Sequence, residues 1–145
     1  MIAGAAVVGR VVRVSTSSAT VLLAADPQSG IGARDQGSGE IGTVRGAGTA
    51  GFTYTPLDAA ARPRRGATLV TGPAGSTTYV PGLTIGTVTS IGTDPSGLAV
   101  ARVVPAAKAS TLDVVGVIRL GGQSRPRPAI IPRPASVPGA QARPR

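Results

Sequence analysis

Residues 66–92 constrain the fold of this chain most strongly, because they combine runs of β-branched side chains with glycine and proline. Residues 68–71 and 85–91 lie on either side of a loop that contains Gly72, Pro73, Gly75, Pro81 and Gly82. Side chains branched at Cβ fit a pleated surface, whereas Gly and Pro supply backbone angles that a strand does not hold. This stretch predicts two strands joined by a non-helical loop. It contains no His, Cys, Lys, Asp or Glu, so we expect a scaffold that works by contact.

The rest of the chain alternates short apolar runs with turn residues in the same way. Further strands are predicted at residues 7–14, 19–24, 31–34, 40–45, 52–57, 98–104 and 113–120. The turns at residues 26–30 and 94–97 have a physical basis, because Asp bonds its own backbone, Pro fixes φ and Gly accepts positive φ. No segment shows a helical period over three turns. The sequence therefore predicts an all-β protein.

Three short segments resemble one another, namely residues 8–11 (VGRV), 41–44 (IGTV) and 85–88 (IGTV). In each, we expect the glycine to mark a bulge or a sharp bend, as strands of a small barrel require. The similarity is a weak sign of a body in two parts. Common composition is the alternative, because the chain has 21 glycines.

The composition excludes several kinds of chemistry. Without Cys or His, the chain has no disulfide, no catalytic thiol and no Ser-His-Asp triad. Its six acidic residues are spread along the sequence, so no metal site is expected. A catalytic Ser-Lys pair has only one lysine to use, Lys108, beside Ser96 or Ser110. We predict a protein that is not an enzyme and has no cofactor.

The net charge of +9 is concentrated at the C-terminus. Residues 123–145 carry five arginines and no acid, together with six of the 13 prolines. Such a segment buries too little apolar surface to fold, so a disordered tail is predicted. Its arginines are candidates for contact with anionic wall polymers or lipid head groups. These residues are Arg125, Arg127, Arg133, Arg143 and Arg145.

An alternative function is a basic β-barrel module that binds anionic polymers or nucleic acid. Stacking on bases needs aromatic side chains, and the chain has only Phe52, Tyr54 and Tyr79. Nucleic acid is therefore not a predicted partner. The apolar opening at residues 1–9 is too short to span a membrane and lacks the basic start of a signal peptide.

Seven segments, in this order, resemble the extracytoplasmic β region of the MreC family of rod shape-determining proteins. They are VGRV at residues 8–11, VLLAADPQS at 21–29, SGEIG at 38–42, TYTPL at 53–57, RGATLVTG at 65–72, PGLTIGTV at 81–88 and VVPAA at 103–107. The resemblance covers about residues 7–120. It departs from the family at Ala67, where an acidic residue is usual, and the family's membrane helix and coiled coil are absent from this sequence.

The resemblance implies two small six-stranded β barrels packed side by side at residues 5–122, with the tail at residues 123–145. It implies a non-enzymatic scaffold of the cell-elongation machinery, which organises peptidoglycan synthesis and maintains rod shape. The implied partners are MreD, a class B penicillin-binding transpeptidase, RodA and other MreC copies. The implied location is the extracytoplasmic face of the plasma membrane.

Two loops supply candidate contacts for such partners. Arg62, Arg64 and Arg65 form a basic cluster after a proline-containing turn. The simplest interpretation of this cluster is a solvated loop, and the alternative is a partner contact. In the loop of residues 72–82, Tyr79 is a candidate anchor, because aromatic side chains often dominate binding energy. The alternative for Tyr79 is a partly buried core residue.

Overall fold

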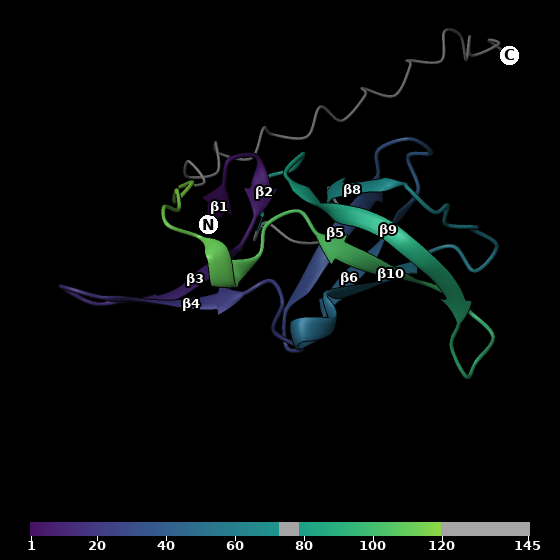
Figure 1. Ribbon diagram of the computed structural model, residues 1–145, viewed down its shortest axis with the longest axis horizontal. Coiled ribbons are helices and arrows are strands. Elements are labelled where there is room, and N and C mark those ends of the chain that lie inside the picture. The colour runs from purple at the N-terminus through teal and green to yellow at the C-terminus, as the bar shows by residue number, and fades with distance from the viewer. Residues whose placement is uncertain (73–78, 120–145) are drawn as a thin grey trace, which may run out of the picture.

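A computed structural model describes residues 1–72 and 79–119 of the chain (Figure 1). The prediction of an all-β fold is confirmed, because helical structure in this part of the chain is limited to two short 3₁₀ turns. The strands are β1 (Ile2–Ala3), β2 (Ala6–Val7), β3 (Gly9–Val14), β4 (Ala19–Leu23), β5 (Gly30–Asp35), β6 (Ile41–Gly46), β7 (Phe52–Pro56), β8 (Thr68–Thr71), β9 (Thr84–Thr93) and β10 (Ala99–Pro105). The 3₁₀ turns are η1 (Gly48–Ala50) and η2 (Ala109–Thr111).

Six of these strands close into a barrel. Around it, β5 pairs with β6, β6 with β7, β7 with β10, β10 with β9 and β9 with β8, and β8 returns to β5. All six pairings are antiparallel. Because β5 and β8 pair with each other, the sheet has no free edge within the barrel.

Alternation along each strand fills the barrel interior. In β7, Phe52 and Tyr54 are buried while Thr53 and Thr55 face outward, as the period of two requires. All three aromatic residues of the chain lie in the core, and the other core side chains are aliphatic. The core cluster comprises Val7, Ala24, Ile31, Ala33, Val44, Phe52, Tyr54, Leu69, Tyr79, Ile85, Val88, Ala101 and Val103.

The three similar glycines share one structural role. A Cβ at Gly9, Gly42 or Gly86 would lie 2.4, 2.4 or 2.1 Å from a backbone carbonyl oxygen of the neighbouring strand. Their φ angles are not positive, so the requirement is space rather than an unusual backbone angle. Only Gly86 pairs at a register shift, which lies between Leu69 and Val70 of β8. The glycines therefore mark close approach of strands, and the expected bulge applies to one of the three.

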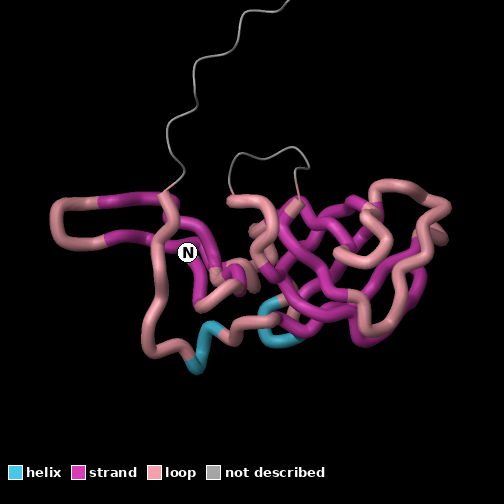
Figure 2. The backbone as a smooth tube through the Cα atoms, turned by 90° about the horizontal axis from the view of Figure 1, so that it is seen from above, coloured by secondary structure: helices cyan, strands magenta, loops and turns pink. Residues whose placement is uncertain are grey.

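The strands outside the barrel form two hairpins. β1 pairs with β2, and β3 pairs with β4 in a separate two-stranded sheet that extends away from the barrel in Figures 1 and 2. Of the two six-stranded barrels expected from the sequence, the described residues therefore show one. The predicted strand at residues 113–120 is wrong over its described part, where a single bridge joins Gly116 to Ile2. That segment finds no partner strand long enough to form a ladder.

The hairpins join the barrel at two places. β2 pairs in parallel with the start of β9 at Ala6 and Thr84. After β4, the backbone N–H of Gly48 donates to the carbonyl of Ala25 at 2.9 Å. Gly46 allows this contact, because a Cβ there would lie 2.2 Å from the Asp26 carbonyl oxygen. Close backbone packing thus fixes the end of β4 against the barrel.

Candidate functional site

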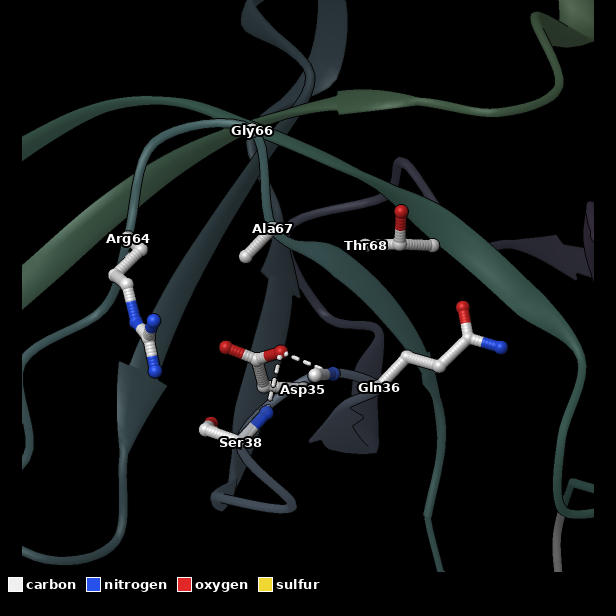
Figure 3. Close-up of a pocket in the computed structure, with 8 residues that line it drawn as sticks. Asp35, Gln36, Ser38, Arg64, Gly66, Ala67 and Thr68 are labelled. Carbon is white, nitrogen blue, oxygen red and sulfur yellow. Dashed lines mark hydrogen bonds between the residues drawn. The ribbon is translucent and has the colours of Figure 1, made fainter.

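A charged groove lies at one end of the barrel, between the β5–β6 turn and the loop that leads into β8 (Figure 3). Its volume is about 470 Å³. It is lined by Asp35, Gln36, Gly37, Ser38, Arg64, Gly66, Ala67 and Thr68. We call it the Asp35–Arg64 groove.

Backbone hydrogen bonds hold the walls of this groove in place. The N–H of Gln36 donates to the Thr68 carbonyl at 2.9 Å and ties the two walls together. Within the second wall, the N–H of Ala67 donates to the Arg64 carbonyl at 3.1 Å, and the N–H of Gly66 ties this wall to β9 by donating to the Val88 carbonyl at 2.8 Å. Gly66 has φ +83°, an angle that favours glycine. The groove is therefore preformed by the barrel.

Asp35 is the buried charged residue of the groove, with 6% of its surface exposed. Its Oδ1 accepts hydrogen bonds from the backbone N–H groups of Gly37 at 2.8 Å and Ser38 at 3.3 Å. A short acidic side chain at the end of a strand forms such a turn readily, which is why β5 ends here. Within the described part of the chain, no hydrogen bond reaches Oδ2, which faces the side of Arg64 in Figure 3.

A smaller hollow of about 80 Å³ adjoins the groove. Asp35 and Ser38 line both spaces, and the hollow adds Glu40, Tyr54, Arg62 and Pro63. Burial, together with the smaller effects of the nearby charges of Glu40 and Asp35, raises the pKa of the Tyr54 hydroxyl to about 12. The Tyr54 hydroxyl donates a long hydrogen bond of 3.5 Å to the Glu40 carbonyl. The two spaces are thus lined by the buried or partly buried acids Asp35 and Glu40 and by the exposed arginines Arg62 and Arg64.

The three arginines of the predicted basic cluster differ in their surroundings. All three are exposed. Arg62 donates from Nη1 to the carbonyls of Ala59, Ala60 and Ala61 at 3.3, 3.0 and 3.0 Å, so it caps its own loop. Arg64 lines the groove, whereas Arg65 lines neither space. A partner contact by these residues stays a prediction.

Tyr79, the predicted anchor, lies in the core cluster with 7% of its surface exposed. Its hydroxyl is buried without a hydrogen-bond partner among the described residues. This placement agrees with the alternative given for Tyr79 from the sequence. Contact with a partner stays a prediction, and it requires the ring to leave the core.

An apolar cleft of about 550 Å³ lies between the barrel and the N-terminal hairpins. Its lining includes Val7, Val8, Phe52 and Val104, together with small residues of the η1 turn. Lys108 and Ser110 line this cleft, both are exposed, and no hydrogen bond joins their side chains in the described structure. Ser96 instead binds the Asp94 carboxylate in the β9–β10 turn, at the opposite end of β10 from Lys108. The sequence reasoning missed this cleft, because its lining comes from four separate segments.

Exposed apolar side chains gather on the hairpins and on the segment after η2. Seven of the eleven large hydrophobic residues that are exposed in the described structure lie there, so the surface is unevenly apolar. They are Val12, Val14, Leu23, Val114, Val115, Val117 and Ile118. We call this set the hairpin surface, because the bridge from Gly116 to Ile2 joins the second segment to the hairpins. Neither edge of the β3–β4 sheet pairs with another described strand.

A closed six-stranded barrel with two added hairpins defines the class of protein as a small β-barrel protein. The family model of the rod shape-determining protein MreC, barrel core, matches residues 1–119. The chain therefore belongs to the MreC family, as the sequence resemblance predicted. Among curated proteins, no relative matches the chain.

Solved structures agree with this assignment. A structure of MreC is 27% identical, with a TM-score of 0.66, and the match covers 74% of this chain and 61% of that one. MreC from Pseudomonas aeruginosa is 28% identical, with a TM-score of 0.60, over 70% of this chain and 66% of that one. A third structure is a complex between Penicillin-Binding Protein (PBP2) and MreC from Helicobacter pylori. It is 18% identical, with a TM-score of 0.56, over 71% of this chain and 63% of that one, and it supports the fold.

The match spans less than two thirds of each of these three chains. No helix in the described part of this chain is both long and apolar enough to cross a membrane. The arginines predicted to contact anionic polymers, at positions 125, 127, 133, 143 and 145, lie outside the described residues.

Proposed function

We propose that this chain is a non-enzymatic scaffold of the cell-elongation machinery, which helps to organise peptidoglycan synthesis by contacts with other proteins. The observation that carries this proposal is the hairpin surface, where exposed valines lie on a two-stranded sheet with open edges. An isolated hairpin is marginally stable in water, so partner contacts would stabilise it.

Strand addition is the physical mechanism of the proposal. An unpaired strand edge offers a row of N–H and C=O groups to an extended segment of a partner. Apolar side chains beside that edge, such as Val12 and Val14, supply the buried area. A specific interface needs roughly 800 Å² per partner, so the proposal requires contact with the apolar cleft as well as with the hairpin surface. Strands added in this way would also extend the hairpins toward the second barrel expected from the resemblance.

The proposed partner is a class B penicillin-binding transpeptidase. The complex of PBP2 with MreC from Helicobacter pylori supports this class of partner, since that MreC shares the fold. We extend the proposal to MreD, RodA and further MreC copies, and to a location on the extracytoplasmic face of the plasma membrane. The division into a β region at residues 5–122 and a tail at 123–145 belongs to the same proposal, with the tail arginines contacting anionic wall polymers or lipid head groups.

The test compares two exposed apolar residues in one binding experiment. Val14 is 72% exposed on the hairpin surface, and Leu57 is 74% exposed after β7. We expect Val14→Asp to weaken binding of the full chain to a purified class B transpeptidase about 10-fold, because it places a charge in the interface. Leu57→Asp should leave binding unchanged, and both variants should keep the melting temperature of the parent chain. Equal binding by all three chains, or no binding by the parent chain, would overturn the proposal.

A further inference from the structure

We propose that the Asp35–Arg64 groove binds a small ligand that carries both an ammonium group and a carboxylate, such as the zwitterionic form of a free amino acid or a short peptide. This inference is independent of the scaffold function, because the groove shares no residue with the hairpin surface.

The ammonium end is assigned from Asp35. This side chain is 6% exposed, but Oδ2 is not among the buried polar atoms that lack a partner, so this oxygen is accessible from the groove that Asp35 lines. A carboxylate in such a largely buried position favours a positively charged partner. Two backbone N–H groups satisfy Oδ1, while Oδ2 accepts no hydrogen bond from the described residues. An ammonium group has three donors and one positive charge, so it can donate a hydrogen bond to Oδ2 and pair with the carboxylate charge.

The carboxylate end is assigned from Arg64. Its guanidinium lies across the groove from Asp35 in Figure 3 and donates no hydrogen bond to the described residues. A planar guanidinium binds a carboxylate through two parallel hydrogen bonds. Ala67 is short and points into the same space, which leaves room between the two charges.

Charges of both signs select against simpler ligands. A lone anion would be repelled by the carboxylates of Asp35 and Glu40, which line the groove or the adjoining hollow. A lone cation would be repelled by the guanidinium groups of Arg62 and Arg64. No group of three metal-ligating side chains exists among residues 1–72 and 79–119. A zwitterion places each of its charges against the opposite one.

Size and rigidity also fit a ligand of this kind. The groove volume of about 470 Å³ lies within the range of roughly 300–1,000 Å³ that is usual for small-molecule sites. Because the hydrogen bond from Gln36 to Thr68 fixes the two walls, little ordering is needed on binding.

The experiment titrates the full chain with alanyl-alanine and follows the backbone amides of Gly37, Ser38 and Gly66 by NMR. Two matched probes each lack one charge, namely N-acetyl-alanyl-alanine and alanyl-alanine amide. We expect saturable shifts with alanyl-alanine and about 10-fold weaker binding for each blocked probe. Absence of saturable shifts, or equal binding of the three probes, would overturn the proposal.

Variants assign each end of the ligand. Asp35→Asn keeps the oxygen that accepts from Gly37 and Ser38, so the turn is retained while the charge is lost. It should remove the preference for alanyl-alanine over the acetylated probe, and Arg64→Ala should remove the preference over the amide. Arg65→Ala is the control, since Arg65 is exposed and does not line the groove. If Arg65→Ala and Arg64→Ala have equal effects, the assignment is wrong, and this comparison holds even if Asp35→Asn fails to fold.

Discussion

Replacing Gly86 by alanine should destabilise the barrel strongly, because β9 and β10 approach too closely there for a side chain. An added Cβ would lie 2.1 Å from the carbonyl oxygen of Val104 and 2.9 Å from its carbonyl carbon. Both contacts are with backbone, so no side-chain rotation relieves them. The distance between this Cβ and the Val104 oxygen must grow by about 1.3 Å or more to restore an ordinary contact.

The expected loss of stability follows from that displacement. Inserting an extra methyl group into a packed interior costs about 1–3 kcal/mol. Separating the strands also weakens ladder hydrogen bonds near Gly86, such as that from Ala106 to Ile85 at 2.9 Å, at about 1 kcal/mol each. We expect a total loss of about 3–4 kcal/mol, against a free energy of unfolding of about 5–15 kcal/mol for a domain of this kind.

Gly92→Ala is the matched control on the same strand. A Cβ at Gly92 meets nothing within 4 Å, and its φ is not positive. This substitution should leave stability unchanged or raise it by about 0.5–1 kcal/mol, because alanine restricts the unfolded chain. Urea unfolding followed by far-ultraviolet circular dichroism measures both variants. If Gly86→Ala unfolds at the same urea concentration as the parent chain, the close approach of β9 and β10 does not constrain the fold as we argue.

Two further predictions concern pH. The pKa of Tyr54 is raised from 10.0 to about 12 in the folded chain, so its contribution to stability is complete below pH 10 and is lost as pH rises through about 12. The melting temperature should fall as pH rises from 10 to about 12, and Tyr54→Phe should largely remove this fall. If the melting temperature of Tyr54→Phe falls as steeply with pH as that of the parent chain, the assignment to Tyr54 is wrong. Hydrogen bonds from the Ser96 hydroxyl and from the backbone N–H of Leu98 lower the pKa of Asp94 below 3.8. The contribution of Asp94 to stability is therefore present above pH 3.8 and is lost as pH falls through its lower pKa in the folded chain. Asp94→Asn should flatten the dependence of the melting temperature on pH at the acid side. An equally steep dependence in this variant would count against these hydrogen bonds.

Local signals predicted most strands because the residues that end them are distinctive. β8 has the bounds expected from the sequence, since its Thr and Val residues lie between Gly66 and Gly72. The prediction failed at residues 113–120, where Val and Ile have the same β propensity but Gly116 forms the single bridge. A strand needs a partner edge as well as a propensity, and the sequence of one segment does not show which edges are available.

The Asp35–Arg64 groove was only partly predictable for a related reason. The sequence analysis identified Arg64 as part of a basic cluster, whereas Asp35 was only one of six acidic residues spread along the chain. Its burial results from packing of the β5–β6 turn against the loop before β8, two segments about 30 residues apart in the sequence. Long-range packing of this kind creates sites that local patterns do not reveal.

The two proposed binding surfaces lie at opposite ends of β5, which allows them to be tested separately. Gly30, at the start of β5, follows the loop that fixes the hairpins to the barrel, whereas Asp35 ends the strand in the groove. Six residues of strand span about 20 Å, which exceeds the Debye length of about 8 Å at physiological salt. Val14→Asp should therefore leave alanyl-alanine binding intact, and Asp35→Asn should leave transpeptidase binding intact. If either variant impairs both activities, the change acts through the stability of the barrel, because no shared contact connects the two surfaces.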